Sequence, residues 1–164
     1  MNLRKTGTGL LILLTAWGLF TAFPTKKRQV LRTLKAFSRA VEKDGLENDF
    51  QAAALARKTS TFFAPRCRVE AEGYGLSAEV EREEVARYAF ALRQRAQRLT
   101  LRFYDPHVEI GPEGEARVEA TARLQGESEG GDALREIHEV RCLLRKGEDG
   151  WKFEKVVLVE VLRR

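Results

Sequence analysis

The spacing of hydrophobic positions changes twice along the chain, and each change marks a different kind of element. The first pattern is a run of 17 uncharged residues, Gly7 to Phe23, with basic residues on both sides. At 1.5 Å per residue the run makes a helix of about 25 Å, and long basic side chains at its ends can reach the headgroups of a membrane core ~30 Å thick. The pattern predicts an N-terminal transmembrane helix over residues 1–25, with Leu10–Phe23 in contact with the lipid bilayer.

A cleaved secretory signal is the alternative for this segment. Such a signal needs small residues at −3 and −1, but cutting after Ala22 places Phe20 at −3 and cutting after Ala16 places Leu14 there. We therefore expect an uncleaved signal anchor that crosses the inner membrane of a bacterium once. The basic residues at the two ends do not decide its orientation, and the short leading tail favours a domain on the periplasmic side.

Three stretches after the anchor have the 3.6-residue period of amphipathic helices. The first begins at Lys26 and stops before Gly45. Asn48, with Gln51 three residues later, is typical of a helix N-cap and predicts the start of the second helix. A third helix is predicted from about Ser77 to Leu99.

Polar and apolar residues alternate in the remaining segments, which is the spacing of β-strands. A short strand pair surrounds "CRVEAEGYGL", and four longer strands follow the third helix. Segments rich in Gly separate those four, which read "LTLRFYDPHVEI", "EARVEATARLQ", "LREIHEVRCLLR" and "WKFEKVVLVEVL". Residues 26–164 are therefore predicted to form one α+β domain.

The order of these elements resembles the nuclear transport factor 2-like superfamily, also called SnoaL-like. The stretch "GEDGWKFEKVVL" is similar to that family's closing hairpin, with a Trp just after the turn. The resemblance covers about Lys26 to Arg164. It implies a cystatin-like fold, in which three helices pack on a strongly bent antiparallel sheet and close it into a cone.

The formal charge of +5 is concentrated next to the apolar run. Residues 1–35 hold seven Lys or Arg and no acid, which leaves 22 basic and 24 acidic residues from Ala36 onward. Basic residues beside a membrane segment contact anionic headgroups. A later Arg-rich run shares its helix with several Glu and is interpreted as a solvated face; it consists of Arg82, Arg87, Arg93, Arg95, Arg98 and Arg102. The sequence therefore predicts no nucleic-acid partner.

Six polar side chains are candidates for the interior of the cone. In some members of the superfamily, ketosteroid isomerase among them, that interior holds catalytic Asp and Tyr side chains. The candidates here are Tyr88, Tyr104, Asp105, His107, Glu136 and His138. Pro106 interrupts the alternation, so the sequence does not decide which of Tyr104, Asp105 and His107 faces inward. Glu136 and His138 share a strand face with three apolar residues and are expected inward, either as a general base or as a hydrated pair at the rim.

No residue set in the sequence announces a cofactor or a metal. The two His residues are far apart, and no Cys or Asp cluster has ligand spacing. A phosphate-cradling Gly loop and a nucleophile signature are absent from the sequence as well. We therefore predict no metal and no cofactor, and the sequence favours a non-catalytic role over an enzyme.

The last strand is apolar on both faces. One face carries Val156, Leu158 and Leu162, and a sheet face that is not packed on helices stays wet unless something covers it. These three residues are therefore interface candidates for a protein partner or a homo-oligomer bound through the sheet. Shielding by neighbouring Arg and Glu side chains is the alternative.

Cys67 and Cys142 are the only cysteines of the chain, and each lies on the apolar side of its strand. In an oxidising compartment they could form a disulfide, provided that their Cα atoms come within about 7 Å. Service as small apolar core residues is the alternative.

Together these patterns favour a membrane-anchored, non-catalytic interaction or assembly module of the cell envelope. The inner-membrane assembly component of type IV secretion systems similarly joins one transmembrane helix to a domain of this fold, although only six residues precede the apolar run here. The alternative is a small-molecule-binding protein or SnoaL-like enzyme that uses the cone interior. Converging Tyr, Asp and His side chains would favour the enzyme, and an interior plugged by Phe and Leu would favour the module.

Overall fold

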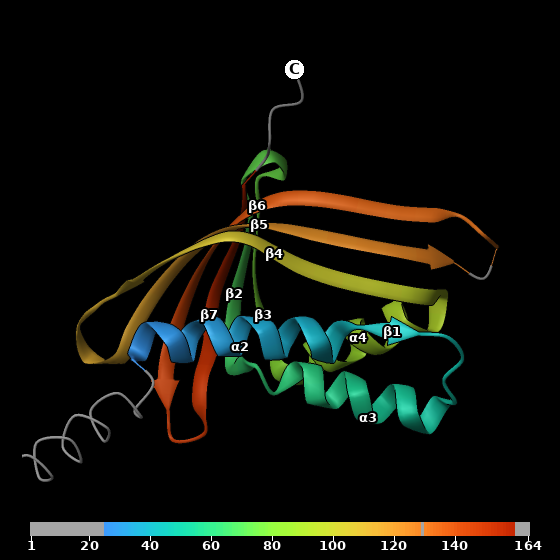
Figure 1. Cartoon of the computed structure of the whole chain (residues 1–164), viewed down its shortest axis with the longest axis horizontal. Helices are drawn as coiled ribbons and strands as arrows, with labels where there is room; N and C mark the ends of the chain where they lie inside the picture. Colours follow the sequence, from blue (N-terminus) through green and yellow to red (C-terminus); the bar gives the residue numbers. More distant parts are fainter. Residues whose placement is uncertain (1–24, 129, 160–164) are drawn as a thin grey trace, which may run out of the picture.

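Over residues 25–128 and 130–159, which the computed structural model describes, three helices lie against the concave side of a strongly bent seven-stranded sheet (Figure 1). The helices are α2 (Lys26–Val41), α3 (Asp49–Ser60) and α4 (Arg82–Arg95). The strands are β1 (Lys43–Asp44), β2 (Phe63–Ala71), β3 (Leu76–Glu81), β4 (Ala96–Ile110), β5 (Glu115–Ser128), β6 (Ala133–Gly147) and β7 (Gly150–Val159), with 3-10 turns η1 (Glu72–Tyr74) and η2 (Pro112–Gly114). The α+β class and the three helices on a bent sheet are confirmed.

The sheet has the strand order β1-β4-β5-β6-β7-β2-β3. Neighbouring strands are antiparallel except β2 and β7, which run parallel. In Figure 1 the long strands β4, β5 and β6 arch over α2, whereas β7, β2 and β3 run down behind it. The register shifts in β4 between Tyr104 and His107, and between β6 and β7 beside Leu143 and Leu144. Such bulges bend a strand and change which face its next side chain takes.

Side-chain caps determine where the helices begin. Asn48 Oδ1 accepts a bond from the Gln51 N–H at 2.8 Å, and Gln51 Oε1 accepts one from the Asn48 N–H at 3.2 Å. This is the capping box expected from the sequence. Glu81 and Glu84 form the same arrangement at the start of α4.

The third helix is shorter than the sequence pattern predicted. The prediction of helix over Ser77–Leu99 is wrong at both ends, because α4 spans only Arg82–Arg95. Before it, Ser77 pairs with Glu70 of β2, and after it Leu99 pairs with Gly126 of β5. Sheet pairing of these backbone groups therefore overrides the local helical pattern.

The hydrophobic core lies between α2 and the concave face of the sheet. Val30 and Leu34 of α2 are buried against a cluster that includes Val118, Leu144 and Trp151. Trp151 directly follows the turn between Gly147 and Gly150, as the closing-hairpin motif predicted. Burial of one face of α2 is thus what joins the helix layer to the sheet.

Arg93 departs from the solvated helix face predicted for the Arg-rich run. Its side chain is only 2% exposed. The guanidinium donates to the backbone carbonyls of Ala40, Val41 and Glu42 and to both carboxylate oxygens of Glu47. It thus satisfies carbonyls that the end of α2 leaves without helical partners and ties that end to α4.

Among the described residues, no helix is long and apolar enough to cross a membrane. The anchor predicted over residues 1–25, with Leu10–Phe23 in lipid, lies outside them except for Thr25. Thr25 caps α2, since its Oγ1 accepts a bond from the Arg28 N–H at 3.3 Å. Leu162 lies outside the described residues as well. The anchor and its membrane therefore stay predictions.

Candidate ligand-binding cavity

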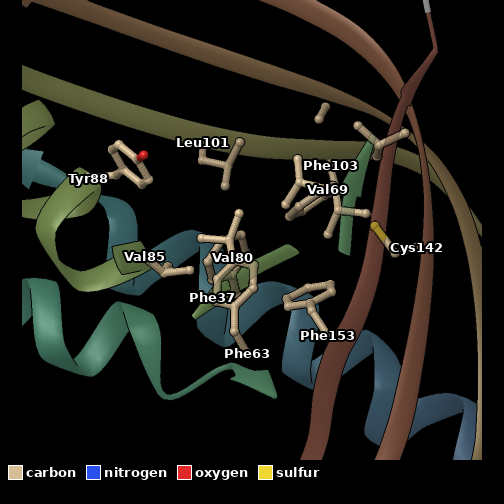
Figure 2. Close-up of a pocket in the computed structure, with 13 residues that line it drawn as sticks. Phe37, Phe63, Val69, Val80, Val85, Tyr88, Leu101, Phe103, Cys142 and Phe153 are labelled. Carbon is tan, nitrogen blue, oxygen red and sulfur yellow. The ribbon is translucent and has the colours of Figure 1, made fainter. Parts of the chain in front are cut away.

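An apolar cavity of about 380 Å³ opens on the concave side of the sheet (Figure 2). Both the helices and the sheet contribute to it, because its walls come from α2, α4 and six strands. Its volume falls in the range of small-molecule sites, roughly 300–1,000 Å³. The aromatic lining consists of Phe37, Phe63, Tyr88, Phe103 and Phe153, and the remainder of Val69, Val80, Val85, Leu101, Ala122, Val140, Cys142 and Val156.

Three phenylalanines from three different elements make a rigid base for the cavity. Phe37 of α2 lies with its ring centroid 5.5 Å from that of Phe63 and 5.2 Å from that of Phe153, both at steep angles. Phe63 and Phe153 are themselves 5.3 Å apart. Edge-to-face contacts of this kind stabilise a fixed ring arrangement by about 0.5–1.5 kcal/mol per pair. The cavity is therefore a preformed feature of the packing.

Only two lining side chains carry a polar atom, and Figure 2 shows them at opposite ends of the cavity. Tyr88 of α4 lies at the open end, 67% exposed. Cys142 of β6 lies at the closed end and is buried. Burial raises the pKa of the Cys142 thiol to about 12, with a smaller contribution from Cys67, so the thiol is neutral at physiological pH.

Tyr104 faces away from the cavity. It lies directly opposite Thr121 of β5, on the convex face of the sheet. The guanidinium carbon of Arg123 lies 5.0 Å from the centroid of its ring, within cation–π range. Tyr104 therefore belongs to the outer surface.

Asp105 and His107 also lie on the outer side. Asp105 adopts a left-handed backbone conformation, with φ of 49°, in the bulge before Pro106. The bulge brings His107 opposite Glu119, an exposed residue of β5, and its Nε2 lies 3.3 Å from Glu109 Oε1. Alternation alone could not reveal that His107 faces outward, because Asp105 and Pro106 together oppose the single residue Ala120 of β5.

Glu136 and His138 lie on the same face of β6 as Val140 and Cys142, as the alternation predicted. They are not among the residues that line the cavity. His138 Nε2 lies 3.1 Å from Glu136 Oε2, and both side chains are partly exposed. The geometry is that of a hydrated pair beyond the end of the cavity.

The two cysteines do not form a disulfide. Both thiols are free and buried. Strand β7 lies between them. Cys142 of β6 pairs with Val156 at one edge of β7, and β2, which carries Cys67, pairs with the other edge. Strands two positions apart are separated by roughly 9–10 Å, which exceeds the Cα separation a disulfide allows.

Two of the proposed interface residues point inward. Val156 lines the cavity and Leu158 packs on the core, on the same side as Phe153. Strict alternation from Val156 puts Phe153 on the opposite face; the structure differs because Glu154 is an extra, unpaired residue of β7. The bulge at Glu154 advances the alternation by one position.

The convex face of β7 carries Val157 instead. Val157 lies between Arg141 of β6 and Glu70 of β2 and is only 7% exposed. Ion pairs join the long side chains around it, Lys155 with Glu70 at 2.9 Å and Arg141 with Glu72. This is the shielding by Arg and Glu that the sequence left as an alternative.

Most of the cavity lining escaped the sequence analysis. Within the part of the chain that the structure describes, no three His, Cys, Asp or Glu side chains are grouped as metal ligands would be. Of the six polar candidates for the cone interior only Tyr88 lines the cavity, and the other lining side chains are apolar apart from the thiol of Cys142. Leu101 and Phe103 lie two residues apart on β4, which is the spacing of side chains on one strand face. The charged residues around them hid this pattern in the sequence.

No protein-family model matches the chain, and neither does any curated protein. Solved structures do match. A proposed dehydratase of the nuclear transport factor 2-like family from Streptomyces avermitilis superposes with a TM-score of 0.66 and 18% identity, over 85% of this chain and 98% of that one. The chain has the nuclear transport factor 2-like fold.

Two proteins from Novosphingobium aromaticivorans extend this comparison. A nuclear transport factor 2-like protein with a cystatin-like fold aligns over 99% of this chain and 92% of its own, with a TM-score of 0.60 and 11% identity. A proposed aromatic-ring hydroxylase aligns over 82% and 88%, with a TM-score of 0.66 and 14% identity. At these identities the likeness establishes the nuclear transport factor 2-like fold and nothing about activity.

Proposed function

We propose that this protein is a non-catalytic binding module whose cone takes an apolar small molecule. The observation that carries the proposal is the lining of the cavity, where thirteen side chains contribute one hydroxyl, one neutral thiol and otherwise only carbon. Such a surface is poorly matched to water and favours an apolar ligand. Binding energy would come from burying that ligand's surface, with Tyr88 available for one hydrogen bond at the mouth.

The same lining argues against catalysis in the cavity. Acid–base chemistry needs a titratable group within hydrogen-bond reach of the reacting atoms. The carboxylate and imidazole candidates Asp105, His107, Glu136 and His138 lie outside the cavity wall. The buried Cys142 is held as a thiol, which is a weak nucleophile.

An apolar photoaffinity probe tests the proposal in the full chain within its membrane. A fatty alcohol of medium length that carries a diazirine should label peptides of β4 and β6, and unlabelled alcohol should compete. Ala122→Leu adds bulk inside the cavity and should lower that labelling about tenfold. Ala54→Leu, which makes the same change at an exposed site on α3, is the matched control. Equal labelling of both variants would exclude the cavity as the binding site.

The N-terminal apolar run is part of this proposal. An anchor over residues 1–25 would hold the domain at the inner membrane, where apolar molecules concentrate, with the domain on the periplasmic side. The run is long enough to span and has poor cleavage sites.

A second candidate function is assembly with a protein partner or a second copy through the convex face. The supporting observation is a row formed by Tyr104, Arg123 and Ile137 across β4, β5 and β6, in which Tyr104 and Ile137 are exposed and Arg123 is half-buried between them. Tyr and Arg are enriched in the residues that contribute most to interface affinity. Chemical crosslinking in the native membrane tests it: Ile137→Lys should abolish crosslinked species, and Ile110→Lys, the same change at another exposed Ile, should not.

A further inference from the structure

The exposed side of helix α2 is strongly basic. Its sixteen residues include six Lys or Arg and no Asp or Glu. Four of them, Arg28, Arg32, Lys35 and Arg39, recur every three or four residues and therefore lie on one face. We call these four residues the α2 stripe. It is about 16 Å long at 1.5 Å per residue, and each member is exposed.

The stripe lies opposite the face by which α2 is packed. Val30 and Leu34 are buried and, with 3.6 residues per turn, lie roughly 100–180° around the helix axis from the members of the stripe. The stripe therefore cannot turn inward without removing α2 from the core. Its orientation on the molecule is fixed by the packing.

The charges of the stripe are uncompensated within the described residues. Ten ion pairs are present there, and none involves a member of the stripe. Basic residues elsewhere, such as Arg145 with Glu154 and Lys155 with Glu70, have acidic partners. A row of like charges without counter-charges repels itself and attracts an anionic surface.

We infer that α2 lies along an anionic lipid bilayer, with the α2 stripe against the headgroups. Charge complementarity supports this partner. Chain continuity supports it too, because α2 begins at Lys26, directly after the apolar run that ends at Phe23. The inference concerns a surface different from the cavity and does not depend on the apolar ligand. It identifies a second membrane contact, made by the folded domain itself.

A dye beside the stripe measures this contact in the full chain. Ala36 is exposed on α2, and the two native cysteines are buried, so Ala36→Cys provides the reactive thiol for labelling the folded protein. The labelled chain is reconstituted in discs of phosphatidylcholine, alone or mixed with phosphatidylglycerol, that contain a headgroup-linked quencher. We expect stronger quenching in the anionic discs and its reversal at ~0.5 M salt, where surface charges are screened.

Paired variants separate the stripe from net charge. Arg32→Gln with Lys35→Gln should weaken docking about 25-fold, at roughly fivefold for each charge near an anionic surface. Arg117→Gln with Arg135→Gln removes the same charge from exposed positions on the convex face and should leave docking unchanged. Equal quenching in the two kinds of disc, or equal losses in the two double variants, would overturn the inference.

Two further outcomes keep the proposals apart. If the chain fails to insert into discs, that failure contradicts the anchor. The labelled chain is then added to anionic vesicles, and quenching of the dye there supports lipid docking by the α2 stripe. Tight binding of duplex DNA by the α2 stripe, at salt that abolishes lipid docking, would assign the surface to nucleic acid and overturn the lipid partner.

Discussion

Arg93 and Glu47 form a nearly dry ion pair where the three helices meet. Arg93 Nε lies 3.0 Å from Glu47 Oε2, and Nη2 lies 2.5 Å from Oε1. Each charge has lost most of its water and depends on the other for compensation. Removing one partner of such a pair typically costs 3–5 kcal/mol, because the remaining charge stays buried.

We therefore expect Arg93→Met to lower the free energy of unfolding by about 3–5 kcal/mol. Urea denaturation of the full chain measures the change. Arg95→Met is the matched control, since Arg95 is exposed on the same helix and should change stability by less than about 0.5 kcal/mol. Similar losses in both variants would contradict a structural role for the pair.

Gly126 is a site where no side chain fits. A Cβ built there would lie 2.9 Å from the Arg98 carbonyl oxygen and 3.0 Å from Leu99 Cδ2, because β4 and β5 approach closely. Gly126→Ala should therefore destabilise the domain by about 1–3 kcal/mol in thermal or chemical unfolding. Gly147→Ala meets only an ordinary contact at 3.8 Å and serves as the comparison. A fully stable Gly126→Ala variant would mean that the strands separate at little cost.

The buried thiols should make stability fall in alkaline solution. Burial raises the pKa of Cys67 to about 11, with Glu154 adding to the shift, and that of Cys142 to about 12, while an unfolded thiol titrates near 9.0. Between pH 9 and 11 the unfolded chain loses protons that the folded chain keeps, so unfolding becomes easier as pH rises. Each thiol contributes about 1.4 kcal/mol per pH unit in that window.

Comparison with the variant Cys67→Ala, Cys142→Ala isolates this contribution, since Lys and Tyr titrate alike in both proteins. The stability of the variant should fall less steeply above pH 9. Thiol titration of unfolded, non-reduced protein from its native compartment should return two reactive thiols. A count of zero would reveal a disulfide and remove the basis of the pH prediction.

The N-terminal run should remain on the mature protein. Because cleavage after Ala16 or Ala22 would place a large residue at −3, intact mass of the membrane-extracted chain should include Trp17 and Phe20. Recovery of a soluble form that begins between Thr21 and Lys26 would show a cleaved signal and exclude the anchor.

Local patterns sufficed wherever a residue's environment depends on near neighbours. The capping box of Asn48 and Gln51 needs only four consecutive residues, and the inward face of Val140, Cys142 and Leu144 follows from unbroken alternation along β6. The turn before Trp151 is equally local. These signals, with the order of the elements, determined the α+β class and the nuclear transport factor 2-like arrangement.

Only the tertiary structure decided features that depend on distant pairing. Bulges at Asp105 and Glu154 reverse the alternation because the partner strand lacks a matching residue, and so His107 faces out and Val156 faces in. Arg93 is buried because the end of α2 and Glu47 surround it across some 46 to 53 residues of chain. The cavity likewise has walls from eight elements, none of which encloses space alone. Neither pairing register nor enclosure is encoded in the spacing of any single segment, because each arises only when separate segments meet.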